Sequence, residues 1–218
     1  MSRLLAVDVW FDFICPWCLI GKRQLDKALA LLRQSEPQVQ VAVRWHGVQL
    51  LPQAPAEGWP FMEFYVRRLG SEAAVRQRQA MVLDAAHAAG VELDFGRLRL
   101  MPNTADAHRL FAAACTAGTP EQANALLERL FAAHFSDGAD LGAPATLLAA
   151  ADACGLPAAL GGVLCGADEP YAPPAGSVPD PLSGVPCFEF DGWLALSGAQ
   201  PPAALLAAMR RALAIGTP

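Results

Sequence analysis

The hydrophobic pattern of the first fifty residues changes from the period of a strand to that of a helix and back. Residues 4–13 are almost continuously apolar and β-prone, which is typical of a strand covered on both faces. Residues 19–33 place leucines on one helical face, and residues 39–45 then alternate apolar with polar or small residues. The pattern predicts a β-α-β unit with parallel strands, because the helix is long enough for a crossover connection.

Residues 60–164 show a helical pattern broken by short capping signals. Thr104 and Thr119 are expected to cap helices, and residues 119–122 form a capping-box sequence with proline at the first helical position. Glycines mark the expected helix ends, at Gly70, Gly90, Gly118 and Gly155. Five helices are predicted, at residues 61–69, 72–89, 105–117, 120–135 and 143–153.

The last part of the chain returns to a strand pattern. Residues 166–184 are rich in proline and glycine and predict an irregular loop. Asp191-Gly192 is a strong turn signal between two short apolar runs, at residues 186–190 and 193–197, which predicts a hairpin. A final helix is expected at residues 201–215.

When the helical middle is set aside, the element order is β-α-β followed by β-β-α. This order predicts an α/β thioredoxin fold with a large all-helical insertion. We expect a discontinuous thioredoxin-like domain at residues 1–58 and 166–218, with the inserted helical domain at residues 59–165.

The tetrapeptide Cys15-Pro16-Trp17-Cys18 lies between the first apolar run and the first helix. This position puts the first sulfur at a helix N-terminus, where unpaired backbone N–H groups and the helix dipole favour a thiolate. A thiolate attacks disulfides and also binds soft metals. The motif therefore indicates either redox chemistry or metal binding.

The remaining candidate ligands argue against a metal. A zinc ribbon would need a second close cysteine pair, and the other cysteines are widely spaced. The four histidines are scattered, with no H-x-x-x-H spacing. These other cysteines are Cys115, Cys154, Cys165 and Cys187. We expect redox chemistry and no metal site.

Composition narrows the class of protein. With 54% hydrophobic residues among 218, the chain can bury a core without disulfide cross-links. A net charge of −5 without a basic stripe argues against nucleic-acid partners. No apolar stretch reaches the length of about 18 residues that a membrane span needs. Met1-Ser2-Arg3 leads directly into the first strand, so we expect no signal peptide and a cytoplasmic location.

Three segments together resemble one known family. They are residues 12–18 (DFICPWC, with Gly21 beyond), residues 103–110 (NT..AHRL), and residues 184–188 (GVP.F) followed by residues 197–200 (SGAQ). Taken in this order, they resemble DsbA-like thioredoxin-fold oxidoreductases of the FrnE-like branch.

The resemblance implies a role for each matched residue. Cys15 would be the exposed nucleophile and Cys18 the buried resolving thiol. Pro186 would be a cis-proline beside the cysteine pair, and the backbone of Val185 would pair with an extended substrate. The implied partners are protein or small-molecule thiols and disulfides. No cofactor would be bound, and glutathione would be a candidate redox partner.

Two residues between the cysteines are expected to modulate the site. Pro16 starts the helix and tunes the thiol. Trp17 occupies the position where the periplasmic oxidants of the family carry histidine, so a partly cationic ring is missing. We therefore expect a less oxidising pair than in those proteins.

Several side chains keep two interpretations. Asp12 could take the proton of Cys18 through water or serve only as a hydrogen-bond acceptor at the strand end. Cys187 is either a third redox thiol or a core residue, and Cys115 is expected in the core. His46 and His108 suit packing or capping as well as proton transfer.

Two other functions remain as alternatives. Kappa-class glutathione transferases and hydroxychromene-carboxylate isomerases share the inserted-helix fold and bind glutathione, but they generally have serine at the nucleophile position, where this chain has Cys15. A peptide-binding or chaperone-like module is the alternative outside enzymes. The sequence does not identify the substrate or the oligomeric state, for which a dimer is one option.

Overall fold

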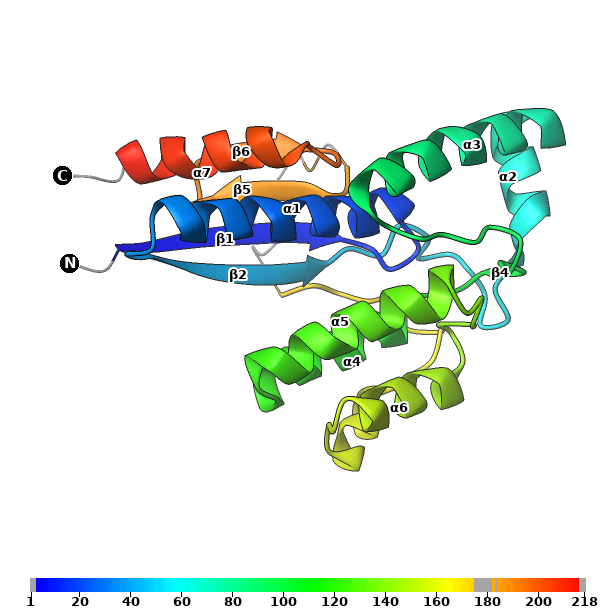
Figure 1. Cartoon of the computed structure of the whole chain (residues 1–218). Helices are drawn as coiled ribbons and strands as arrows, with labels where there is room; N and C mark the ends of the chain where they lie inside the picture. Colours follow the sequence, from blue (N-terminus) through cyan, green and yellow to red (C-terminus); the bar gives the residue numbers. More distant parts are fainter. Residues whose placement is uncertain (1–2, 175–181, 183, 216–218) are drawn as a thin grey trace. The chain divides into compact units, whose positions relative to one another are not determined.

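The structure is a computed structural model that describes residues 3–174, 182 and 184–215 (Figure 1). The chain divides into two compact units. The first comprises residues 1–47, 89–91 and 173–218, and the second comprises residues 48–88 and 92–172. The predicted domain boundaries at 58/59 and 165/166 remain a prediction.

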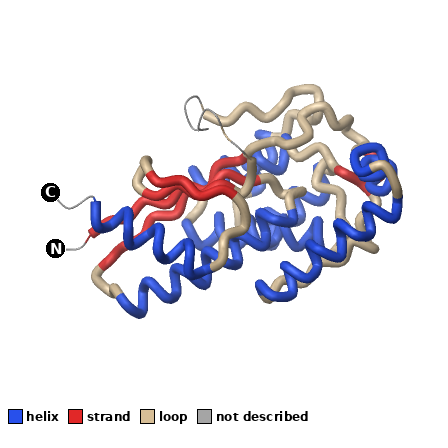
Figure 2. Tube along the Cα trace, turned by 90° about the horizontal axis from the view of Figure 1, so that it is seen from above, coloured by secondary structure: helices blue, strands red, loops and turns tan. Residues whose placement is uncertain are grey.

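The first unit is built on a four-stranded mixed sheet in the order β2-β1-β5-β6, drawn in red in Figure 2. β1 and β2 are parallel, whereas β5 is antiparallel to both β1 and β6. Its elements are β1 (Arg3–Phe11), α1 (Pro16–Ser35), β2 (Val39–Gly47), β5 (Cys187–Phe190), β6 (Leu194–Ser197) and α7 (Pro202–Ile215). The predicted β-α-β and β-β-α halves therefore share one sheet, and the thioredoxin fold is confirmed.

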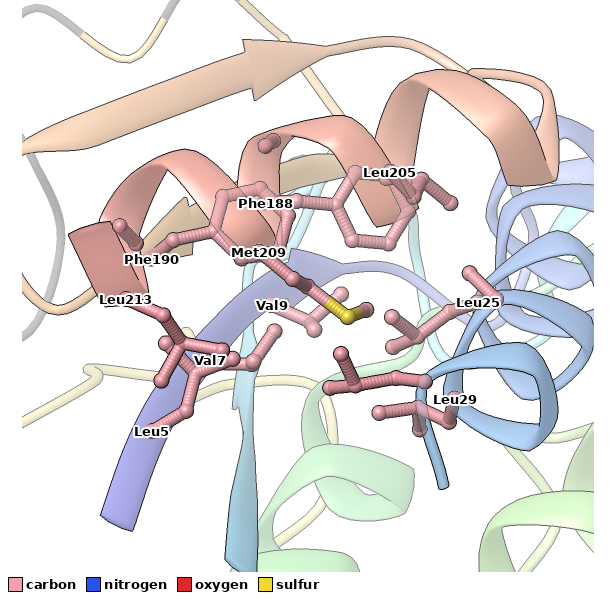
Figure 3. Packing of buried hydrophobic residues seen from close by; sticks show 14 residues of the cluster. Leu5, Val7, Val9, Leu25, Leu29, Phe188, Phe190, Leu205, Met209 and Leu213 are labelled. Atoms are coloured by element: carbon pink, nitrogen blue, oxygen red, sulfur yellow. The ribbon is translucent and has the colours of Figure 1, made fainter. Parts of the chain in front are cut away.

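Helices α1 and α7 lie side by side against one face of this sheet (Figures 1 and 3). Leu5, Val7 and Val9 point to that face because alternate strand residues point the same way, and all three are fully buried. Leu25 and Leu29 of α1 pack onto them, as do Leu205, Met209 and Leu213 of α7. This dry core holds the helix that begins at the C-x-x-C motif against the central strand.

The hairpin between β5 and β6 has a three-residue turn at Asp191, Gly192 and Trp193. Asp191 and Gly192 have positive φ values of 51° and 77°, which explains the Asp-Gly signal in the sequence. Asp191 also binds the central strand, since its carboxylate accepts a hydrogen bond from the Ala6 N–H at 2.8 Å. The turn thus ties the hairpin to β1.

The second unit contains the predicted helices, and four of the five begin and end where the sequence indicates. The unit also holds features that were not predicted: a 3-10 helix and a short antiparallel ladder between two-residue strands. The elements are β3 (Trp59–Pro60), α2 (Phe61–Leu69), α3 (Glu72–Ala89), β4 (Leu100–Met101), α4 (Ala105–Ala117), α5 (Pro120–Phe135), α6 (Pro144–Ala153) and η1 (Ala158–Val163).

The two expected threonine caps differ. Thr119 forms the predicted capping box, in which its hydroxyl accepts the Gln122 N–H. The prediction for Thr104 was wrong, because its side chain makes no capping hydrogen bond. The side-chain oxygen of Asn103 instead accepts the N–H of Ala105, the first residue of α4, at 3.0 Å.

The proline-rich segment before β5 is only partly described. Residues 167–174 contain no helix or strand, in agreement with the predicted irregular loop. Residues 175–181 and 183, which belong to the same predicted loop, lie outside the described residues. Among the described helices, none is both long enough and apolar enough to cross a membrane.

Candidate active site

Cys15 occupies the position directly before α1, at the end of the turn that leaves β1. Its backbone is extended (φ −90°, ψ 109°), and Pro16 follows as the first helical residue. The Cys15 carbonyl accepts the Cys18 N–H at 3.0 Å, which closes the first turn of the helix. Cys15 therefore lies at the N-terminus of a helix, as the sequence predicts.

Cys18 lies one turn further along α1 and is completely buried. Cys15 is buried as well, with 8% of its surface exposed, so the expectation of an exposed nucleophile was wrong and only the order of exposure within the pair agrees with it. Burial raises the pKa of the Cys18 thiol well above its ordinary value, and the hydrogen bond with the Cys15 side chain raises the pKa further. Cys18 is therefore held as a neutral thiol beneath Cys15. The two sulfur-bearing side chains differ in access to solvent.

The segment before β5 brings Val185 and Pro186 next to Cys15. The Val185–Pro186 peptide bond is cis, as the resemblance implies. The Cys15 thiol donates to the Val185 carbonyl oxygen, with 3.8 Å between sulfur and oxygen. Within the described part of the chain, the Val185 N–H forms no hydrogen bond, because the pairing of β5 with β1 starts only at Cys187.

Gly21 fixes how closely this segment approaches α1. A β-carbon on Gly21 would lie 2.9 Å from Cγ of Pro186 and 3.1 Å from Cζ of Phe188. On the other side, the Pro186 carbonyl accepts the Gly198 N–H at 2.7 Å. Pro186 is thus held between the helix of the cysteine pair and the end of β6.

Asp12 is fully buried in the turn between β1 and α1. Its carboxylate accepts the Ile14 N–H at 3.5 Å, and its carbonyl accepts the Cys15 N–H at 3.1 Å. The residue also acts on Cys18, since its backbone lowers the pKa of that thiol and its carboxylate charge raises it. The hydrogen-bonding role of Asp12 is thereby confirmed, and proton transfer remains a prediction.

The other cysteines lie in different surroundings. Cys187 is buried in β5, and burial together with Glu189 raises the pKa of its thiol. The expectation that Cys115 lies in the core was wrong, because Cys115 is exposed. The buried face of α4 includes Phe111 and Ala114, and Cys115 follows Ala114 by about 100° around the helix.

A second buried carboxylate, Asp8, was not singled out from the sequence. The parallel register puts Asp8 beside Arg44, whose guanidinium donates to both carboxylate oxygens, and Nε2 of His46 lies 2.6 Å from Oδ1 of Asp8. Burial would raise the pKa of Asp8, but hydrogen bonds from Arg44 and His46 outweigh burial and lower it. His46 also stacks on Trp10, so the structure gives it packing and hydrogen-bonding contacts.

His108 is buried in the second unit and stacks on Tyr171, with 5.1 Å between the ring centroids. This contact agrees with the packing interpretation of His108. Among the described residues, no group of three or more His, Cys, Asp or Glu side chains is arranged to hold a metal ion.

Known protein structures resemble the whole chain. A probable DsbA oxidoreductase from Streptomyces coelicolor superimposes with a TM-score of 0.84 at 27% identity, covering 98% of this chain and 92% of that one. The cytosolic disulfide reductase DsbM from Pseudomonas aeruginosa has a TM-score of 0.60 at 20% identity, with coverage of 97% and 100%. A 2-hydroxychromene-2-carboxylate isomerase also has a TM-score of 0.60, at 19% identity, with coverage of 94% and 95%.

The last two likenesses show the fold alone, because their identity is low. No curated protein matches the chain. The DSBA-like thioredoxin domain family matches residues 6–167, which is most of the chain. The chain is a member of the DSBA-like thioredoxin domain family.

Proposed function

We propose that the protein is a thiol–disulfide oxidoreductase or isomerase that uses the dithiol of Cys15 and Cys18. The observation that carries the proposal is the asymmetry of the pair: Cys15 keeps some exposure at the helix start, whereas Cys18 is fully buried with a raised pKa. An exchange enzyme needs one thiol that meets the substrate and a second that stays protonated until it is required.

The reaction proceeds in two exchange steps. The Cys15 thiolate attacks one sulfur of a substrate disulfide, which forms a mixed disulfide and releases the other substrate sulfur as a thiolate. Cys18 then loses its proton and attacks the sulfur of Cys15. This second step releases the remaining substrate thiolate and closes the Cys15–Cys18 disulfide, so that two electrons have passed to the substrate. The reverse sequence oxidises a substrate dithiol.

Neighbouring residues have supporting roles in this proposal. Asp12 accepts the Cys18 proton through a water molecule during the second step, a role supported by its burial and its electrostatic effect on that thiol. Val185 offers its N–H to an extended substrate, because this group lies beyond the paired part of β5. Pro186 limits how closely the substrate approaches, while Pro16 and Trp17 set the environment of Cys15.

The substrates are proteins or small molecules that carry thiols or disulfides. No bound organic cofactor is needed, since thiol exchange supplies the electrons. Glutathione is our candidate redox partner, which is consistent with the structure of Pseudomonas aeruginosa DsbM with GSH. A cytoplasmic location and placement in the FrnE-like branch belong to the same proposal, because they rest on the sequence patterns.

A glutathione-binding transferase or isomerase of the kappa-class or hydroxychromene-carboxylate type is the second enzyme candidate. The isomerase structure shares the fold, which favours this alternative, whereas the cysteine at position 15 favours disulfide exchange. A peptide-binding or chaperone-like module is the third candidate. It predicts that neither cysteine matters for function.

Insulin reduction with dithiothreitol or glutathione tests the proposal. We expect Cys15→Ser to abolish the catalysed rate and Cys18→Ser to trap a mixed disulfide that mass spectrometry detects. Cys115→Ser is the matched control, since this cysteine is exposed and lies on a helix of the other unit. Wild-type activity in both Cys15→Ser and Cys18→Ser would refute disulfide exchange and favour the peptide-binding module.

A further inference from the structure

A pocket in the second unit lies at the start of α2 and is not used by the proposed disulfide chemistry. Its volume is about 340 Å³. It is lined by Trp59, Pro60, Glu63, Phe64, Arg67 and Arg68. The pocket therefore combines aromatic walls with two cationic side chains and one carboxylate.

The aromatic walls are held in place by backbone contacts. Trp59 lies in β3, where it pairs with Met101, and Phe64 lies in α2. Their rings are nearly parallel, at 8°, with 5.7 Å between the centroids. Gly58 precedes Trp59 with a φ of 71°, and a β-carbon there would meet the Met101 carbonyl oxygen at 2.9 Å. The two rings are thus fixed relative to each other before any ligand binds.

The inner face of α2 anchors the same site. Phe61 is buried and packs against Tyr65, with 4.8 Å between the ring centroids. Its N–H donates to the Arg99 carbonyl at 2.9 Å, so the start of α2 is joined to the chain just before β4. Because the helix is fixed on this face, the residues of its outer face keep their spacing.

The two arginines follow Phe64 by three and four residues, so they share its side of the helix. Neither Arg67 nor Arg68 makes a hydrogen bond or ion pair with any described residue, although Glu63 lies one turn before Arg67. Other arginines of the chain form such ion pairs; on α3, for example, Arg76 pairs with Glu72 at 3.0 Å. Two guanidinium groups without an ion pair among the described residues therefore lie beside one aromatic pair, with Glu63 as the carboxylate in the same lining.

We propose that this pocket binds a planar aromatic carboxylate. A guanidinium offers two parallel N–H donors that match the oxygens of a carboxylate, and the indole and phenyl rings pack against a flat apolar group. Glu63 disfavours a second negative charge on the ligand and accepts a hydrogen bond from a hydroxyl or amine substituent. The volume of about 340 Å³ is at the small end of ligand pockets, which suits a ligand of one or two rings.

Isothermal titration calorimetry with naphthoate tests the site. We expect saturable binding with one ligand per chain, and binding of the uncharged naphthalenemethanol about tenfold weaker or less, because it lacks the charge-assisted hydrogen bonds. Equal affinity for the two compounds would overturn the proposal, since the pocket would then be only an apolar patch. Displacement of naphthoate by an equal concentration of inorganic phosphate would overturn it as well, because a simple anion site needs no aromatic walls.

Variants locate the binding. The double variant Arg67→Gln/Arg68→Gln should weaken naphthoate binding about tenfold or more, and Trp59→Leu should weaken binding of both compounds. The matched control Arg76→Gln/Arg78→Gln removes the same charge from exposed positions of α3 outside the pocket, and it should bind like the wild type. Absence of saturable binding to the wild type, or retained affinity in the Arg67→Gln/Arg68→Gln variant, would refute the assignment. Insulin reduction should be unchanged in both double variants. Unfolding should be unchanged in Arg67→Gln/Arg68→Gln and shifted only slightly in Arg76→Gln/Arg78→Gln, which removes the exposed ion pair of Arg76 with Glu72.

Discussion

The ring of Pro186 lies against the backbone of Gly21, so closely that a β-carbon on Gly21 would come within 2.9 Å of Cγ of the proline. This contact joins the helix that carries both cysteines to the segment that carries Val185. A glycine at this position of α1 costs helix stability, which indicates that the close approach matters more than the local preference of the chain.

Gly21→Ala should therefore destabilise the protein and disturb the cysteine site. The overlap with Pro186 and Phe188 costs about 1–3 kcal/mol, which outweighs the roughly 1 kcal/mol that alanine gains inside a helix. Urea denaturation and the insulin reduction rate are the measurements. Gly162→Ala is the control, since a β-carbon at Gly162 would meet nothing within 4 Å. A Gly21→Ala protein as stable and as active as the wild type would show that the segment can shift at no cost.

Trp17→His should make the cysteine pair more oxidising. A partly cationic imidazole beside Cys15 stabilises the thiolate and hence the reduced form. We expect the equilibrium with glutathione to shift about tenfold, equivalent to roughly 30 mV. Trp193→His is the control, because Trp193 is 42% exposed in the β5–β6 turn, away from the motif in sequence. A reduction potential that does not change in Trp17→His would refute the role assigned to this position.

The raised pKa of Cys18 predicts a pH dependence of stability in the reduced protein. A thiol whose pKa is higher in the folded state stabilises that state fully below its unfolded pKa, near 9.0, and this contribution is lost as the pH rises towards the folded value. The reduced wild type should therefore lose stability above about pH 9 more steeply than Cys18→Ala. Urea denaturation across this range compares the slopes. Parallel slopes in the two proteins would contradict the pKa shift.

The lowered pKa of Asp8 predicts that the folded protein loses stability as the pH falls, the opposite direction to the effect of Cys18. The pKa of Asp8 is lowered in the folded state, so its contribution is present above the unfolded value near 3.8 and is lost as the pH falls through the folded value. Asp8→Asn should cost about 1–3 kcal/mol at neutral pH, because Arg44 and His46 lose a charged partner. This difference from the wild type should shrink below about pH 4. Asp152→Asn, on the exposed side of α6, should have little effect at either pH; a pH-independent cost of Asp8→Asn would point to packing instead.

The two threonines at helix starts should respond differently to substitution. Thr119→Ala removes the capping box of α5 and should cost about 1 kcal/mol. Thr104→Val should be neutral or stabilising, since the Thr104 hydroxyl is buried and finds no hydrogen-bond partner among the described residues. Thermal unfolding of the two variants gives the comparison directly. A loss for Thr104→Val as large as that for Thr119→Ala would mean that the Thr104 hydroxyl does have a partner in solution.

Local signals explain which elements could be predicted from the sequence. The capping box at Thr119, the Asp191-Gly192 turn and the left-handed glycine Gly70 each act within a few residues, so the helices and the hairpin followed from the pattern. The sequence did not predict the 3-10 helix at Ala158–Val163 or the ladder between β3 and β4. The 3-10 helix has six residues and each strand only two, which is too short to show a hydrophobic period. The capping prediction for Thr104 failed because a threonine before a helix signals only a possible cap; the side chain that bonds to the start of α4 is that of Asn103, one residue earlier.

The sequence by itself determined the order of the longer helices, the order of the strands of the main sheet along the chain, and the position of Cys15 before a helix, because each depends on neighbours along the chain. It also predicts the redox chemistry of the C-x-x-C motif. Only the tertiary structure decided which groups surround that cysteine. The carbonyl of Val185 lies 3.8 Å from the sulfur of Cys15 although 170 residues separate them, and the sheet order that places β5 beside β1 brings them together. Asp8 and Arg44 likewise meet only because β1 and β2 pair in one parallel register. Such contacts depend on packing of the whole domain, which no local pattern encodes.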